Sequence, residues 1–171
     1  MTSVVKNPDP SSGLPFAGVF LHDGALAAMK VEQITIFLEN QSGRLADVAS
    51  ILAAAGVNIR ALSLADSADF GILRLIVHDT EKASQVLKAE GFTVAKTEVV
   101  GVQVPDRPGG LAEILNAMKA NRVNVEYMYA VVHQAAVNAT MIFRFDDLEK
   151  GIACLQQAGI KILRGEDVYS I

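Results

Sequence analysis

Two stretches of the chain repeat one pattern 66 positions apart, and this repeat constrains the fold more than any other feature. The first, at residues 40–59, reads NQSGRLADVASILAAAGVNI, and the second, at residues 106–125, reads DRPGGLAEILNAMKANRVNV. Identical residues coincide at this offset, among them Gly43 with Gly109, Leu45 with Leu111 and Asn58 with Asn124. Chance similarity of two amphipathic helices would not keep a glycine, an asparagine and the order of elements together. The repeat therefore predicts two versions of one structural unit.

Hydrophobic periodicity predicts the same order of elements, βαββαβ, in each half. In the first half we expect strands at 32–39, 57–65 and 70–77 and from residue 92, with helices over about 45–55 and 80–90. In the second half we expect strands at 99–105, 123–132 and 137–145, helices over 111–118 and 146–159, and a closing strand running from IKIL to DVYSI (160–171). Asp79 or Thr80 is expected to cap the second helix of the first half, and Asp146 and Asp147 to cap its counterpart.

This pattern predicts an α+β protein made of two ferredoxin-like βαββαβ units in tandem, with antiparallel sheets and the helices on one face. Strands such as QITIFL and GILRLIV carry apolar residues at both parities, which is typical of strands covered on both faces. The helices cover one face only. We therefore expect a second copy of the chain to bury the other, as a homodimer.

The domain boundaries follow from the repeat. Lys82, Leu87 and Gly91 match Lys150, Leu155 and Gly159 at an offset of 68, which places a two-residue insertion in the second hairpin. The first domain is expected at 29–97 and the second at 98–171. Residues 1–28 contain three of the five prolines and show no sustained period, so we expect a leader or vector-derived segment outside the fold.

Composition excludes several classes of function. A net charge of −4 and a pI near 5.3 argue against nucleic acid, which binds a concentrated basic face. No apolar run is long enough to cross a membrane, and a single cysteine, Cys154, fits a reducing compartment, so we expect a cytoplasmic protein. Cys154 is expected to be a small buried apolar residue. The three histidines show no ligand spacing, so the sequence implies neither a metal nor a cofactor.

The repeated stretches resemble the ACT domain, a small βαββαβ ligand-binding module of regulators and regulated enzymes in amino-acid metabolism. DRPGGLAEIL is close to the usual D/N-x-P-G-x-L opening of that family, while NQSGRLADVA lacks the proline but keeps the asparagine, glycine and leucine. The resemblance covers about residues 31–171. It implies a tandem protein without a catalytic domain, whose turn and asparagine positions bind the head group of a free amino acid, commonly between two ACT units.

The chemistry of the turn supports the same ligand independently. A turn that leads into a helix leaves backbone N–H groups free and partially positive, which suits a carboxylate. Glycine lets the backbone approach the ligand, and an asparagine side chain both donates to and accepts from a zwitterion. The candidate ligand-binding residues are Asn40, Ser42, Gly43, Arg44, Leu45, Asn58 and Ile59 in the first half, and Asp106, Gly109, Gly110, Leu111, Asn124 and Val125 in the second.

A purely structural reading of these residues is also open. Gly43 and Gly109 could be simple turn glycines, and Ser42 or Asp106 could be simple N-caps. Asn58 could serve only to form the turn between helix and strand. Tyr127 and Tyr129 share a strand face and could stack on a ligand ring, although packing on the sheet is the favoured interpretation. Phe70 is expected in the core or at an interface.

The expected function is non-catalytic binding of a small amino acid by a regulator or sensor, with a regulated enzyme on another chain as a possible partner. No nucleophile–base pair or acid pair emerges that would make the chain an enzyme. A small metabolic enzyme on this fold and a structural assembly module without ligand are the alternatives. The halves differ at Asn40/Asp106, Ser42/Pro108 and Arg44/Gly110, so they are expected to bind unequally, with the first half favoured for the anionic end.

Overall fold

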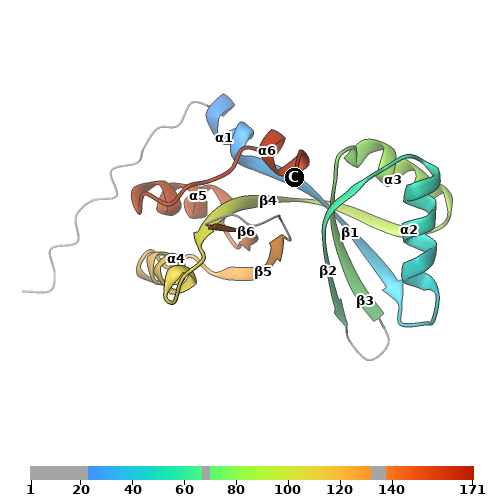
Figure 1. The fold of residues 1–171 in the computed structure, drawn as a ribbon, viewed down its shortest axis with the longest axis horizontal. Helices are drawn as coiled ribbons and strands as arrows, with labels where there is room; N and C mark the ends of the chain where they lie inside the picture. Colours follow the sequence, from blue (N-terminus) through green and yellow to red (C-terminus); the bar gives the residue numbers. More distant parts are fainter. Residues whose placement is uncertain (1–22, 67–69, 132–137) are drawn as a thin grey trace, which may run out of the picture.

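A computed structural model describes residues 23–66, 70–131 and 138–171 (Figure 1). Residues 1–22, the tip of the first hairpin and the site of the two-residue insertion lie outside these ranges. The elements, in chain order, are α1 (Asp23–Met29), β1 (Lys30–Glu39), α2 (Arg44–Ala54), β2 (Ile59–Asp66), β3 (Phe70–Val77), α3 (Thr80–Ala89), β4 (Thr93–Pro105), α4 (Gly110–Ala120), β5 (Val125–Val131), β6 (Asn138–Phe145), α5 (Leu148–Gln157) and α6 (Gly165–Tyr169). The two predicted βαββαβ halves are thus present up to the closing strand of the second.

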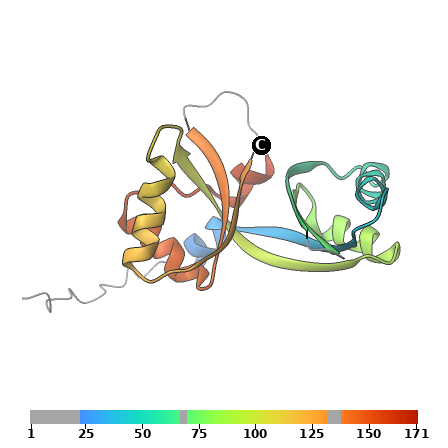
Figure 2. The same ribbon diagram turned by 90° about the horizontal axis from the view of Figure 1, so that it is seen from below.

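The two halves share one six-stranded antiparallel sheet, in the order β2-β3-β1-β4-β6-β5. The long strand β4 joins them, because its first part pairs with β1 and its last part with β6 (Figure 2). Val100 is the crossover, since it lies opposite both Lys30 and Phe143. The predicted boundary between residues 97 and 98 falls inside this strand.

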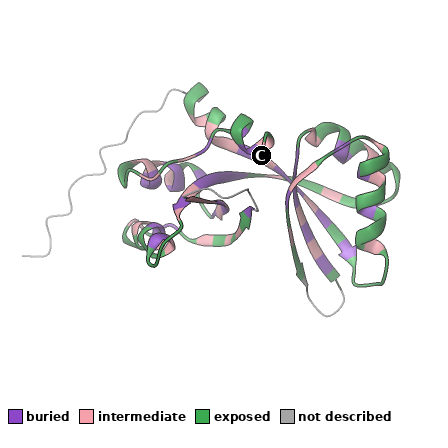
Figure 3. Cartoon of the chain, viewed as in Figure 1, coloured by how far each residue is buried: buried purple, intermediate pink, exposed green. Residues whose placement is uncertain are grey.

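Each half has its own core between the sheet and two helices. In the first half, α2 and α3 cover the face that carries Ile34, Ile36 and Leu75, all at most 1% exposed. In the second half, α4 and α5 cover Val102 and Phe143. Figure 3 shows the consequence for α2, whose outer face is exposed while its inner side is buried. The predicted ferredoxin-like arrangement, with two helices on one face of the sheet in each half, is confirmed.

A third core lies on the opposite face of the sheet, where the edge strands β2 and β5 approach each other. Its buried members come from strands of both halves and from the last twenty residues: Val31, Ala61, Ile76, Val99, Val131, Ile142, Leu163 and Val168. Tyr127 and Tyr129 pack against this core, which confirms that they belong to a packed sheet face. The curl of the sheet therefore covers part of the face that we expected a second copy to bury.

The rest of that face is exposed in the first half. Phe37 in β1 is 48% exposed and Phe70 in β3 is 57% exposed. Phe37 lies opposite Ile72 across the β1–β3 ladder, and the neighbouring Glu39 lies opposite Phe70, so the two aromatic residues lie on one surface. Phe70 is therefore not a core residue. An interface at this surface remains a prediction.

The predicted closing strand of the second half is wrong beyond Leu163. Residues 161–163 do run along β4: Gln103 N donates to Lys161 O at 2.9 Å, and Leu163 N donates to Gly101 O at 2.8 Å. The next position along this edge lies opposite Val100, which Lys30 of β1 already occupies. The chain must therefore leave the sheet, and DVYSI contributes to α6 instead of a strand. Gly165 passes so close that an added Cβ would lie 3.0 Å from Lys30 O.

Residues 23–28, which the sequence prediction left outside the fold, belong to α1. Leu26 and Met29 pack against the core of the second half. The short apolar run that follows the proline-rich region thus has a structural reason: it packs against the core of the second half.

Asp79 and Asp147 are confirmed as helix caps, whereas Asp146 is not. Asp79 and Asp147 are N-caps, because their carboxylates accept from Lys82 N at 2.9 Å and from Lys150 N at 3.0 Å. Asp146 instead accepts from Asn124 N at 2.9 Å. Cys154 is buried, as expected, and burial raises the pKa of its thiol.

Candidate functional site

Glycines in the left-handed region open the helices of both repeated stretches. Gly43 is the N-cap of α2 with φ 94°, and Gly109 is the N-cap of α4 with φ 88°. Residues with a Cβ are strained at such angles, which explains why glycine stands at both positions. The interpretation of Ser42 or Asp106 as N-cap is therefore wrong, and neither helix has a side-chain cap.

The two turns share their hydrogen bonds as well as their glycine. Three backbone hydrogen bonds of the first turn recur in the second at the offset of 66. The first turn has Gln41 N to Glu39 O (2.8 Å), Arg44 N to Gln41 O (3.4 Å) and Asp47 N to Gly43 O (2.9 Å). The second has Arg107 N to Pro105 O (2.9 Å), Gly110 N to Arg107 O (3.0 Å) and Glu113 N to Gly109 O (3.0 Å). Within the described residues, the turns supply no backbone acceptor for the amides of Leu45 and Leu111. Both helices thus present first-turn N–H groups without a cap.

The turns differ where Arg44 is replaced by Gly110. An added Cβ at Gly110 would lie 2.1 Å from Pro105 O, so no side chain fits there. In the first half the corresponding space accepts the Arg44 side chain, whose guanidinium lies 4.6 Å from the centre of the Phe92 ring.

Arg44 is also engaged by two acidic residues. Its Nε lies 3.7 Å from Glu39 Oε2, and its Nη1 lies 3.6 Å from Asp47 Oδ2. These carboxylates offset its charge. The charges around Arg44 thus give no support to the prediction that the first half binds the anionic end of the ligand.

Asn58 and Asn124 occupy equivalent positions at the far ends of α2 and α4. Asn58 N donates to His78 Nδ1 at 3.1 Å, and Asn124 N donates to Asp146 Oδ1 at 2.9 Å. Both asparagines are exposed. Because each helix has eleven residues, with a rise of about 1.5 Å per residue, roughly 16 Å separates the glycine of a half from its asparagine. A small ligand cannot touch both within one half.

The other predicted site residues lie near one end or the other of these helices. Asn40, Ser42, Leu45 and Asp106 are exposed beside the turns, whereas Leu111, Ile59 and Val125 are half-buried and pack against the cores. The structure therefore brings together the turn residues of each half and separates them from Asn58, Ile59, Asn124 and Val125.

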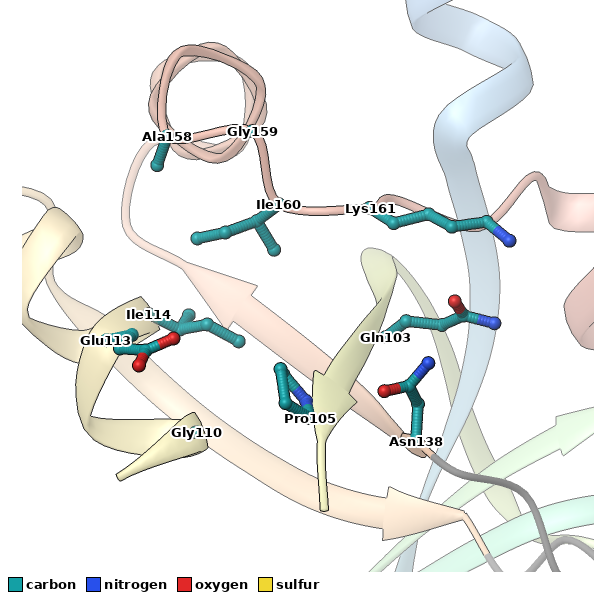
Figure 4. A pocket seen from close by; sticks show the side chains of 10 residues that line it. All are labelled: Gln103, Pro105, Gly110, Glu113, Ile114, Asn138, Ala158, Gly159, Ile160 and Lys161. Atoms are coloured by element: carbon teal, nitrogen blue, oxygen red, sulfur yellow. The ribbon is translucent and has the colours of Figure 1, made fainter. Parts of the chain in front are cut away.

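Two cavities occupy equivalent places beside the helix N-termini. The first-half cavity, of about 310 Å³, is lined by Arg44, Asp47, Ser50, Ile51, Glu90 and Phe92. The second-half cavity, of about 370 Å³, lies between β4, the start of α4 and the loop after α5 (Figure 4). Its lining includes the counterparts of Arg44, Asp47, Glu90 and Phe92, namely Gly110, Glu113, Ala158 and Ile160.

The sequence prediction missed three polar residues of the second cavity: Gln103, Asn138 and Lys161. Their first-half counterparts are Phe37, Phe70 and Thr93 at offsets of 66 and 68. A comparison of the two halves at every strand position would have found them, because two apolar residues of the first half are replaced by amides in the second.

Other kinds of site are not evident in the described part of the chain. No group of three or more His, Cys, Asp and Glu residues there could hold a metal ion; His22 and His133 lie outside it. No helix within the described ranges is long and apolar enough to span a membrane.

The paired halves, the shared turn geometry and the sequence all indicate one family. A family profile described as ACT domain pair matches residues 29–170, and the chain belongs to this family. Membership supports a ligand-binding, regulatory role. A comparison with curated proteins gave no significant match.

Solved structures agree with this assignment. The crystal structure of protein BT0572 from Bacteroides thetaiotaomicron superposes with a TM-score of 0.79 at 41% sequence identity, covering 85% of this chain and 99% of that chain. The ligand-free regulatory subunit of aspartate kinase from Thermus thermophilus has a TM-score of 0.55 at 19% identity, covering 77% of this chain and 95% of that chain. The second similarity concerns the fold alone.

Proposed function

We propose that the protein is a non-catalytic regulator or sensor that binds a free amino acid at its repeated turns. The observation that carries this proposal is the pair of uncapped helix N-termini, each opened by a left-handed glycine and built with the same hydrogen bonds. Such a turn presents N–H donors and a partial positive charge to a carboxylate. The regulatory subunit of aspartate kinase among the similar folds is consistent with this kind of protein.

The proposed ligand lies between the turn of one unit and the asparagine of another. Because Asn58 and Gly43 are at opposite ends of α2, the turn must find its asparagine in a different unit. A second copy of the chain can supply it, and the exposed Phe37 and Phe70 give that copy an apolar surface. The proposed assembly is therefore a homodimer, and the regulated enzyme is a separate chain.

Ligand binding would act by shifting populations. An amino acid that contacts two units favours the packing in which both contacts are made. A regulated partner that binds one packing better would then respond to the concentration of the amino acid.

A thermal-shift screen with the twenty amino acids tests the proposal. Ligands that bind the folded state alone raise the unfolding temperature. We expect one or two amino acids to do so, and Asn58→Ala or Asn124→Ala to remove the shift. If no amino acid raises the unfolding temperature, the proposal fails and the assembly module without ligand becomes the better account.

A further inference from the structure

The second-half cavity differs from its first-half counterpart in a way that the fold does not require. Its walls come from four separate parts of the chain: the end of β4, the first turn of α4, the start of β6, and the loop after α5. A volume of about 370 Å³ is within the usual range of small-molecule sites. None of its polar side chains belongs to the turn-and-asparagine set on which the proposed function rests.

One wall of the cavity is polar. Figure 4 shows the amide ends of Gln103 and Asn138 and the ammonium of Lys161 on the same side of the space. Gln103 and Asn138 are half-buried, and no salt bridge within the described residues involves Lys161. A free ammonium beside two amides is a donor set for a carboxylate.

The opposite wall is largely apolar. Ile114 is 1% exposed and Ile160 is half-buried, and both side chains lie on the side of the cavity away from the Lys161 ammonium (Figure 4). Glu113 stands at the rim, where its carboxylate accepts from Arg107 Nη2 at 2.6 Å and is thereby partly neutralised. The apolar wall suits a short aliphatic chain.

The first half cannot hold the same ligand. Phe37, Phe70 and Thr93 stand where the second half has Gln103, Asn138 and Lys161, so the polar wall is missing. Arg44 moreover lines the first-half cavity and lies over Phe92, whereas its counterpart Gly110 has no side chain. The two halves therefore carry different side chains on equivalent backbones. The first half has an apolar surface, and the second has a cavity with a polar wall.

We infer that the second-half cavity binds a small carboxylate that carries a short aliphatic chain, with its carboxylate at Lys161, Gln103 and Asn138 and its chain against Ile114 and Ile160. An aliphatic α-amino acid and the corresponding 2-oxo acid share this chemistry. The site takes one molecule per chain and needs no second copy. It adjoins the second turn at Gly110, but it shares no polar side chain with the site proposed between units.

Titration calorimetry on the full chain with L-valine and with 3-methyl-2-oxobutanoate tests this inference. We expect one of the two to bind, and Lys161→Gln to weaken that binding about tenfold or more, because a charge-assisted hydrogen bond is lost. Gln103→Leu should weaken it as well. The matched control is Lys119→Gln, which removes an exposed lysine of α4 outside the cavity and should leave the affinity unchanged.

The outcomes are separable from those of the proposed function. Binding of valine alone would show that the site recognises the ammonium group of the amino acid. Binding of the oxo acid alone would show that it does not. Either result supports the site. Loss of binding in Asn58→Ala or Asn124→Ala with none in Lys161→Gln would place the ligand between units and overturn the inference. Absence of binding by both probes at millimolar concentration would overturn it too, whatever the screen of the other amino acids shows.

Discussion

Gln33 Nε2 donates a hydrogen bond to Tyr127 Oη at 2.9 Å, although these residues are 94 positions apart and belong to different halves of the repeat. Gln33 is fully buried in β1. Tyr129 Oη donates to Gln33 Oε1 at 3.0 Å, and the guanidinium of Arg74 lies 4.0 Å from the centre of the Tyr127 ring. This polar cluster, where the curled sheet brings β5 over β1, ties the two halves together.

Gln33→Ala should therefore lower the free energy of unfolding by about 1–3 kcal/mol, because it leaves buried hydroxyl groups without their partner. Urea unfolding measures the change. Gln41→Ala is the matched control, since Gln41 is exposed in the first turn and should change stability by less than about 0.5 kcal/mol. Equal effects of the two variants would show that the cluster does not contribute to stability.

The left-handed N-cap glycines make a second prediction. Gly43→Ala and Gly109→Ala should each cost about 1–2 kcal/mol, because alanine is strained at φ near 90° although there is open space around both positions. Gly24→Ala in α1 is the control. Its backbone angle is ordinary and nothing lies within 4 Å of an added Cβ, so alanine should be neutral or slightly stabilising there.

Alkaline pH should destabilise the protein. Burial raises the pKa of Tyr129, of Tyr169 and of Cys154 above ordinary values of 10.0, 10.0 and 9.0. A raised folded-state pKa means that the unfolded chain releases its protons first, so the stability is fully present below about pH 9 and falls as the pH rises further. Urea unfolding at pH 8 and pH 10.5 should show this fall. It should be smaller in Tyr129→Phe, and an equal fall in both proteins would contradict the buried phenol as a cause.

The exposed surface around Phe37 and Phe70 predicts a dimer. Light scattering at micromolar concentration should give twice the chain mass of 18.2 kDa. Phe37→Glu should shift the mass toward a single chain, because it places a charge in the apolar surface. Met128→Glu changes another exposed apolar side chain, on the helix side of β5, and should leave the dimer intact. A single-chain mass for the unchanged protein would contradict the predicted assembly.

The sequence predicted the elements well where a local pattern determines them. The spacing of Leu45, Val48 and Leu52 places α2, and the capping residues Asp79 and Asp147 open α3 and α5. The closing strand of the second half could not be predicted, because its end depends on Lys30 occupying the edge of β4. Lys30 and the closing segment are far apart in the chain, so no local sequence pattern shows that they compete for the same edge.

The candidate site was predictable in part for the same reason. Gly43 and Gly109 follow from the repeat, since their backbone angles are a local requirement. That Gly43 and Asn58 lie too far apart to share one ligand becomes clear only when the length of α2 is converted into a distance. The cavity residues Gln103, Asn138 and Lys161 come from β4, β6 and the loop after α5, and only the fold brings them together.

Binding of a free amino acid is the central claim, and titration calorimetry tests it most directly. With the amino acid that gives the largest thermal shift, the unchanged protein should bind saturably. Asn58→Ala or Asn124→Ala should weaken the affinity about tenfold or more, as expected when a hydrogen bond to a charged group is lost, while the exposed Asn116→Ala of α4 should not. If no amino acid binds, or if all three variants bind like the unchanged protein, the repeated turn and its asparagine are structural features and not a ligand site.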